Sequence, residues 1–189
     1  MRTRRFSRAI IWAVCLSLFG SLILPSVSQA KTAHEIDTSV SAALDRFMTQ
    51  VRGSRQFLRD AKGVLVLADV YQAGFGVGGE YGEGALRIGG KTVAYYNITA
   101  ASIGFQFGAQ KKDIILVFLQ QKALTDFRAA NGWQAGVDGA VVLVNMGGQA
   151  SIDSTKFNQP IVGFVVGQKG LMYNLTLEGS KITKMAKSS

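Results

Sequence analysis

The residues that could carry out chemistry are few, and the closest group is an acidic pair in a glycine-rich stretch. Glu80 and Glu83 lie three residues apart within Ala73–Gly84, AGFGVGGEYGEG. Two carboxylates at short range could form the pair of a retaining glycosidase, but no tryptophan that could stack on a sugar adjoins them. Alternatively, they accept backbone N–H groups at a bend or pair with a basic side chain. We therefore expect no catalytic role for them.

Other catalytic or metal chemistry has little to build on. The one histidine, His34, lies close to the predicted N-terminus of the mature chain, where chain ends tend to fray. A nucleophilic triad needs a second credible base, and zinc needs a cluster of His, Cys and carboxylate ligands. The one cysteine, Cys15, lies in a segment that we expect to be removed. The sequence thus predicts no enzyme activity, no cofactor and no metal.

Two glycine patterns are similar to nucleotide-binding motifs but fail on context. Gly74–Gly79, GFGVGG, fits G-x-G-x-x-G, yet a poor helix former, EYGEGALRIGG, follows it. A dinucleotide site needs a helix there and an acidic residue further on, and no acid occurs between Glu83 and Asp113. Ala85–Thr92 has alanine where a phosphate-binding loop needs glycine. We exclude both.

The first 30 residues have the pattern of a secretory signal peptide. A 16-residue apolar run, Ala9–Leu24, is followed by PSVSQA, with small residues at Ser28 and Ala30. The run is short for a transmembrane helix, which needs about 20 residues. Four arginines precede it: Arg2, Arg4, Arg5 and Arg8. We predict cleavage after Ala30 and a periplasmic or secreted protein, either free or peripheral on a membrane; the sequence does not separate general secretory from twin-arginine export.

The charge balance favours an anionic partner. The chain has a formal net charge of +9, and without residues 1–30 it keeps 17 basic and 12 acidic residues, or +5. A moderate basic surplus in an exported protein points to anionic membrane or polyanion surfaces more than to nucleic acid. Simple solubility is the alternative.

Apolar periodicity predicts an amphipathic helix over residues 33–52, with Asp37 or Thr38 as capping residues. One stripe at period 3.6 carries it, made of Ile36, Val40, Leu44, Phe47 and Val51. A short second helix, RQFLRDA, follows with Ser54 as its cap. A mid-chain helix is expected over residues 121–130.

Basic residues flank the apolar stripe, a pattern that suits an anionic bilayer surface. In the alternative, the helix packs on the sheet with a solvated basic rim. Further lysines in expected turns could extend the basic patch. The predicted lipid-binding residues are Arg46, Phe47, Arg52, Arg55, Arg59, Lys62, Lys111, Lys112 and Lys169.

From Gly63 onward, apolar runs with short polar or glycine links predict short strands. Half of Ala73–Gly84 is glycine, which disfavours helix and in strands marks a bend or a close backbone approach, so we predict a bent hairpin there. Gln110–Asp113 is predicted as a turn, residues 147–159 as a loop or edge, and Gln168–Gly170 as another turn. Asn97–Thr99 and Asn174–Thr176 match a glycosylation pattern, and we interpret both as ordinary strand residues.

A pattern of glycine, aromatic, any residue, apolar and glycine starts at Gly74, Gly104 and Gly163. It indicates either a decayed repeat of one hairpin per unit or chance. The sequence predicts one α+β domain over residues 31–189. Its sheet is antiparallel, strongly bent and barrel-like, built of glycine-rich hairpins, with an N-terminal amphipathic helix and a mid-chain helix.

Several blocks of the chain resemble the SYLF-domain family, in the order the family has them. They are AKGVLVLADVYQAGFGVGGEYGEG, YYNITAASIGFQFGAQKKDIILVF, ALTDF, NGWQAGVD and GLMYNLTLEGSKI. The resemblance covers about residues 40–185. It implies lipid or protein binding, since eukaryotic relatives bind phosphoinositides and actin filaments and bacterial ones are mostly exported. Family lipid binding is attributed to an N-terminal amphipathic helix and a basic surface, here Arg46, Arg52, Arg55, Arg59 and Lys62.

These observations predict a non-enzymatic, peripheral protein of the cell envelope that binds anionic phospholipid. The alternatives are a protein-binding module of the actin-regulator type, for which a bacterial periplasm would offer no actin, and a small envelope structural protein. A small outer-membrane barrel is disfavoured by the expected short strands, the basic composition and the C-terminal KMAKSS.

Overall fold

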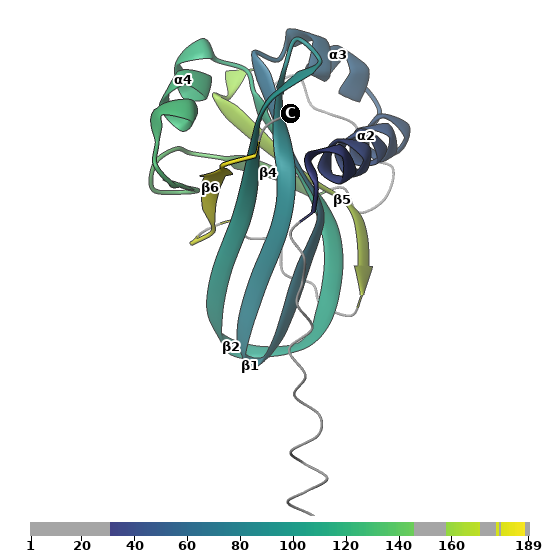
Figure 1. Cartoon of the computed structure of the whole chain (residues 1–189). Coiled ribbons are helices and arrows are strands. Elements are labelled where there is room, and N and C mark those ends of the chain that lie inside the picture. Colours follow the sequence, from purple (N-terminus) through teal and green to yellow (C-terminus); the bar gives the residue numbers. More distant parts are fainter. Residues whose placement is uncertain (1–30, 146–157, 171–176, 178, 188–189) are drawn as a thin grey trace, which may run out of the picture. The chain divides into compact units, whose positions relative to one another are not determined.

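Two long strands joined by a two-residue turn form the centre of the fold (Figure 1). In the computed structural model, β1 (Gly63–Ile88) and β2 (Lys91–Phe118) pair antiparallel along their length. Gly89 and Gly90 connect them with φ of +58° and +80°, values that suit the two-residue hairpin turns that favour glycine. Between Gly63 and Phe118, the prediction of short strands and of a hairpin within Ala73–Gly84 is therefore wrong, because two long strands span this part of the chain.

The structure describes residues 31–145, 158–170, 177 and 179–187. The described residues belong to one compact unit, which begins at Lys31. The predicted signal peptide, the glycosylation pattern at Asn174–Thr176 and nearly all of the expected loop over 147–159 lie outside the described residues.

The β1–β2 ribbon bends back on itself at its glycine-rich middle, at the end of the sheet away from the helices (Figure 1). The register shifts between Phe75 and Val77. The two halves of β1 then come into direct contact: a Cβ on Gly82 would lie 2.6 Å from Val70, and one on Gly84 only 1.8 Å from the carbonyl oxygen of Val66. The predicted close backbone approach is confirmed.

The suggested hairpin repeat is not what the structure shows. Gly74 and Gly108 face each other across the ribbon at the bend, so the segments GFGVG and GFQFG are two sides of one hairpin. The third match, Gly163–Gly167, lies in β5 (Ile161–Gly170). The three matches therefore do not correspond to three separate hairpins: two of them belong to one bent ribbon and the third to another strand.

The remaining strands extend the sheet from the edge of β2 opposite β1, in the order β3-β6-β2-β5-β4 with β1 paired to β2 off this path. β5 and β6 (Lys181–Met185) run antiparallel to opposite ends of β2. β3 (Trp133–Gln134) pairs with β6, and β4 (Val142–Asn145) runs parallel to β5. The sheet is thus strongly curled, as predicted. The parallel pairing of β4 with β5 was not predicted.

The turns predicted at Gln110–Asp113 and Gln168–Gly170 are also wrong, because both stretches lie within strands, β2 and β5. Their polar side chains do not mark an exposed turn. Gln110 is buried, and its side chain donates to Gln72 and accepts from Gln168. Buried polar groups that find hydrogen-bond partners are compatible with a sheet interior.

Three helices cover the other end of the sheet. α2 (Ala33–Gln50) and α3 (Ser54–Asp60) are joined by residues 51–53, and α4 (Gln121–Ala129) follows β2. The N-terminal and mid-chain helices are confirmed. No helix in the described part of the chain combines the length and apolarity needed to cross a membrane.

The caps of these helices differ from the predicted ones. α2 begins at Ala33 as predicted, but its cap is Thr32: the Thr32 hydroxyl accepts from the Glu35 N–H and the Glu35 carboxylate accepts from the Thr32 N–H, a capping box. Asp37, predicted as a cap, instead accepts from the hydroxyls of Thr92 and Tyr95 and ties α2 to β2. α3 is preceded by Gly53 at φ +86° rather than capped by Ser54.

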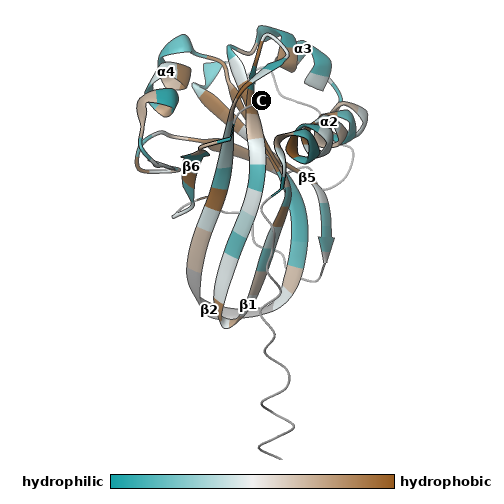
Figure 2. Ribbon diagram, viewed as in Figure 1, coloured by the Kyte–Doolittle hydropathy of each residue, from teal (hydrophilic) through white to brown (hydrophobic). Residues whose placement is uncertain are grey.

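Apolar side chains are buried on both faces of the sheet where the helices cover it. Leu116 and Phe118 of β2 pack with Leu124 and Phe127 of α4 in one cluster. Ile115 and Val117 face the other way, toward α2 and α3, where the ring of Phe164 lies 4.8 Å from Phe47 and 5.5 Å from Phe57. Figure 2 shows the hydrophobic colour concentrated in this part of the sheet.

Candidate anion-binding site

Two irregularities of the sheet meet beside α2. The β1–β2 register shifts between Leu67 and Val70, and the β2–β5 register shifts between Lys111 and Asp113. Asp69, in the first bulge, has φ of +56°, and no other non-glycine residue in the described ranges has a positive φ. Bulges re-aim side chains, and backbone outliers of this kind concentrate at functional sites.

Asp113 holds the two bulges together. Its buried carboxylate accepts the Asp69 N–H at 2.9 Å through Oδ1, and its Oδ2 lies 2.7 Å from both Nε and Nη2 of Arg46. Charged hydrogen bonds of this kind are what a buried carboxylate requires. Gly167, at φ +63°, leaves room for the pair, since a Cβ there would lie 3.0 Å from Oδ2. The sheet and α2 therefore fix the position of the Arg46 guanidinium.

Asp69 forms ion pairs with two lysines. Lys111 Nζ lies 2.8 Å from its Oδ1, and Lys31 Nζ lies 3.6 Å from its Oδ2. Burial raises the pKa of Asp69, but the hydrogen bond and charge of Lys111, with Lys31 and Arg46, outweigh it, so the pKa is lowered overall. The Asp69 hydrogen bond likewise raises the pKa of Lys111. Asp69 and Lys111 are therefore both charged at neutral pH.

Lys169 adds an exposed cation. It lies directly opposite Lys111 in the β2–β5 register, an arrangement of like charges that destabilises a sheet on its own. Together with Arg46, Asp69, Asp113 and Gly167, the two lysines line a cavity of about 80 Å³. We call the set Lys31, Arg46, Asp69, Lys111, Asp113 and Lys169 the bulge cluster. With four cations and two carboxylates it has a net charge of +2, and an anion bound between Lys111 and Lys169 would relieve their repulsion.

The structure thus brings together three of the nine predicted lipid-binding residues: Arg46, Lys111 and Lys169. The other basic residues of the prediction, Arg52, Arg55, Arg59 and Lys62, lie on or beside α3, are exposed, and take part in no ion pair recorded within the described ranges. They form a solvated rim, separate from the bulge cluster. Whether either set contacts lipid stays a prediction.

Two of the predicted residues lie in the interior and need correction as surface contacts. Phe47 is fully buried in the core under α2, which matches the packing alternative. Lys112 is also buried, with its Nζ 2.8 Å from Glu80 Oε2 and 3.1 Å from Gln72 Oε1. Side chains of a strand alternate between faces, so Lys111 and Lys112 could not both face outward.

The acidic pair is separated by the same alternation. Glu80 pairs with Lys112, while Glu83 accepts from the hydroxyl of Tyr81 and pairs with Lys187 at 3.1 Å. Burial, then the hydrogen bond and charge of Glu83, raise the pKa of Tyr81 to about 12. Of the alternatives for Glu80 and Glu83, pairing with basic side chains is therefore confirmed, and the two carboxylates do not face one reaction centre.

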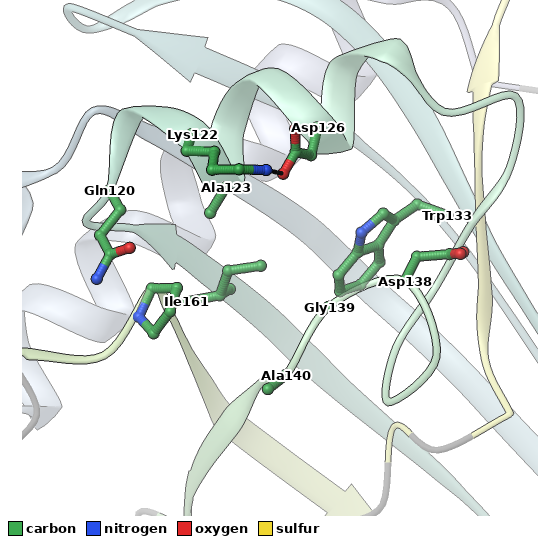
Figure 3. A pocket seen from close by; sticks show the side chains of 10 residues that line it. Gln120, Lys122, Ala123, Asp126, Trp133, Asp138, Gly139, Ala140 and Ile161 are labelled. Carbon is green, nitrogen blue, oxygen red and sulfur yellow. Dashed lines mark hydrogen bonds and ion pairs between the residues drawn. The ribbon is translucent and has the colours of Figure 1, made fainter.

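A second cavity of about 220 Å³ lies beside α4 (Figure 3). Trp133, Ile161 and the Lys122–Asp126 ion pair line it, and the bond between Asp138 and the Gln134 N–H closes its loop. Its mixed lining includes no concentration of charge. Within the ranges that the structure describes, no group of three His, Cys, Asp or Glu side chains is placed to hold a metal ion.

Sequence reasoning missed Lys31, Asp69 and Asp113 as members of the site. The available signal was an acidic residue within each of two otherwise apolar strands, GVLVLADV and DIILVF. An acid in such a run needs a cationic partner, but the sequence does not say that both acids share Arg46.

This geometry defines the class of protein: a small α+β domain with one strongly curled sheet and a charged site on its surface. Residues 99–188, 90 of the 189, match the model of the Ysc84 family, described as Las17-binding protein actin regulator. Over that stretch the chain is similar to this family, and the resemblance to the SYLF-domain family is confirmed. A comparison with curated proteins finds no match. The matched region contains Lys111, Asp113 and Lys169, whereas Arg46 and Asp69 precede it.

Proposed function

We propose that this protein is a non-enzymatic peripheral protein that binds anionic phospholipid surfaces through the bulge cluster. The family is one of lipid- or actin-regulator-associated domains. The observation that carries the finer proposal is the convergence of Arg46, Lys111 and Lys169, from three elements, on one cavity.

The arrangement of the cluster supports a phosphate group as the ligand. Asp113 positions the Arg46 guanidinium from below, and the side chain of Arg46 remains about two-fifths exposed. A guanidinium offers several donors to phosphate oxygens, and the exposed Lys169 adds a point charge beside it. The net charge of +2 means that the cations of the site are not fully neutralised by its own carboxylates, so the site attracts an anion.

The proposal is tested by comparing two pairs of charge-removing substitutions in the chain beginning at Lys31. K111Q/K169Q lowers the cluster charge to zero, while R55Q/R59Q removes the same charge from the exposed rim on α3. Each basic residue near an anionic membrane contributes about 1 kcal/mol, so K111Q/K169Q should weaken binding to phosphatidylglycerol-containing vesicles about thirtyfold at low salt. R55Q/R59Q should weaken it much less.

Vesicle sedimentation across a salt series gives the measurement. The difference between the two variants should shrink toward physiological salt, where the Debye length is about 8 Å. Equal losses in both variants would mean that only net charge matters, and unchanged binding in K111Q/K169Q would refute the cluster as the site.

A protein partner is the second candidate, because the family description names protein binding. The same cluster could then hold an acidic peptide segment. This candidate would be favoured if K111Q/K169Q left vesicle binding unchanged but lost a salt-dependent binding to an acidic peptide that the unsubstituted chain shows.

A further inference from the structure

The bend of the β1–β2 ribbon has the reverse of the usual pattern of a sheet in water. From Val70 to Gly82 of β1, even-numbered positions face inward and odd-numbered ones outward, apart from the exposed Gly76 at the bulge. On β1, the outward-facing residues of the bend are Tyr71, Ala73, Phe75, Val77, Gly79 and Tyr81. A half-buried antiparallel strand normally places polar side chains there.

The exposed side chains on this face are large and apolar. Phe75 is 80% exposed and Val77 67%, with Tyr71 at 57% and Tyr81 at 46% on either side of them. Contiguous exposed apolar surface of this kind marks an interaction site. The two tyrosines flank the most exposed positions, as tyrosines do at the border between lipid and water.

The inward face carries the polar groups instead. Gln72, Glu80, Gln110 and Lys112 are buried between the two halves of the ribbon and bonded to one another. This network satisfies the Lys112 charge inside the protein. The apolar side chains therefore face outward because the interior of the bend is already occupied by a paired polar network.

Within Val70–Gly82 the one charged residue, Glu80, is buried, and the exposed charges begin beyond the bend. No charged residue occurs from Val70 to Gly79 or from Asn97 to Gln110. The charges resume at once with Lys111, the cross-strand partner of Tyr71 on one side and of Lys169 on the other. The Lys111 ammonium lies 5.5 Å from the centre of the Tyr71 ring, so the apolar face of the bend adjoins the bulge cluster.

We infer that the bend inserts into the interface of an anionic bilayer, with Phe75 and Val77 entering the acyl region and Tyr71 and Tyr81 at the head-group level. The inference rests on the proposed function and adds the element that penetrates the membrane. The order along the ribbon supports it: uncharged apolar tip, flanking tyrosines, then Lys111 and Lys169 at the depth of anionic head groups. Because β-strands rise about 3.3 Å per residue, Lys111, beside Tyr71, lies about 13 Å along the ribbon from Phe75.

A lipid surface fits this face better than a protein partner or a second copy of the chain. The bend is the protruding end of a ribbon rather than a groove (Figure 1). The outward-facing residues that the structure describes on β1 at the bend include no charged side chain that could specify a partner. The charges next to it match an anionic head-group layer in sign.

The first test compares two valine-to-serine substitutions in the chain beginning at Lys31. V77S changes the bend, while V137S makes the same change at a valine that is 72% exposed in the 134–139 loop. Removing apolar surface should weaken binding to mixed phosphatidylcholine–phosphatidylglycerol vesicles by about threefold to tenfold for V77S and by more for F75S/V77S, and leave V137S unchanged. The V77S loss should persist at high salt, unlike that of K111Q/K169Q.

The second test places a fluorescent side chain at the tip. In F75W, the new indole should shift its emission to shorter wavelength on vesicle binding and be quenched by lipids brominated in the acyl chain. Trp133, which is buried, provides the background in the unsubstituted chain. Thermal unfolding of each variant shows whether its fold is intact.

Three results would overturn the inference. If F75S/V77S did not affect vesicle binding and the indole of F75W were not quenched, insertion of the bend would be refuted, while the proposed function would still hold. Failure of the unsubstituted chain to bind any anionic vesicle would remove the proposed function as well. Self-association that F75S/V77S abolishes without changing vesicle binding would assign the face to a second copy.

Discussion

Where helices cover the β1–β2 ribbon, both of its faces bury apolar side chains, whereas at the bend Phe75 and Val77 face outward and Gln72 and Glu80 face inward. The same two strands thus follow opposite patterns within one hairpin. A buried apolar face is explained by stability alone. The reversed face leaves large apolar side chains exposed, which is why we assign it to contact with another surface. Substitutions should accordingly change folding in one region and binding in the other.

The largest expected contrast is between two glycines of β1. A Cβ on Gly84 would lie 1.8 Å from the Val66 carbonyl oxygen, while one on Gly79, at the bend, would meet nothing closer than 3.9 Å. Gly84→Ala should therefore lower the free energy of unfolding by more than about 4 kcal/mol, and Gly79→Ala should change it by less than about 0.5 kcal/mol. Urea denaturation of both variants measures this; similar midpoints would contradict the close approach of the strand halves.

Two phenylalanines give the next contrast. Phe47→Ala should cost about 3–5 kcal/mol of stability, because it leaves a cavity beside Phe164. Phe75→Ala should cost less than about 1 kcal/mol, since its ring is already exposed. Thermal and urea unfolding report both. A Phe47→Ala variant that folds as stably as the parent but binds vesicles more weakly would return Phe47 to the lipid-contact set.

A smaller effect is expected at the bulge cluster, between the two regions. Asp113→Asn removes the charge that holds Arg46 and should cost about 2 kcal/mol, a value typical of hydrogen bonds to charged groups. Asp126→Asn, in the exposed Lys122–Asp126 pair of α4, should cost less than about 0.5 kcal/mol. If the two variants are equally stable in urea, Asp113 does not organise the cluster.

The smallest effect concerns Asp69 and depends on pH. Its pKa lies below the ordinary value of 3.8, so the folded state favours the charged form, and this stabilisation is present above pH 3.8 and lost as the pH falls through the lowered pKa. Asp69→Asn keeps a residue that tolerates the left-handed backbone. It should cost less than about 1 kcal/mol near neutrality. The difference from the parent chain in urea midpoints should vanish in acid; a difference that persists there would have a cause other than charge.

The sequence predicted the helices better than the strands. The stripe through Ile36, Val40 and Phe47 is buried as expected, because helical periodicity over many residues leaves little ambiguity. Strand ends were harder, since the polar run at Gln110–Asp113 resembles a turn and becomes part of β2 only because Gln72 and Glu80 pair with it. The Gly89–Gly90 dipeptide was the signal for the true turn.

The candidate site could be predicted only in part. Arg46, Lys111 and Lys169 were chosen as basic residues, but their meeting depends on two bulges and on the β2–β5 register, which a single sequence does not determine. The same holds for Asp69 and Asp113, whose shared contact with Arg46 exists only once α2 is packed on the sheet.

The position of β2 in the sheet also has a consequence for the order in which the chain folds. β1 and β2 are neighbours in sequence and can pair early, whereas the other edge of β2 is paired with β5 over Gln110–Phe118 and with β6 over Tyr95–Thr99. Both covering strands come after Pro160, and pairing over such sequence separations is slow. Until they arrive, β2 exposes unpaired backbone groups along its full length, which are a template for aggregation. We expect a chain that ends before Ile161 to form its hairpin and then to associate with other copies through this open edge.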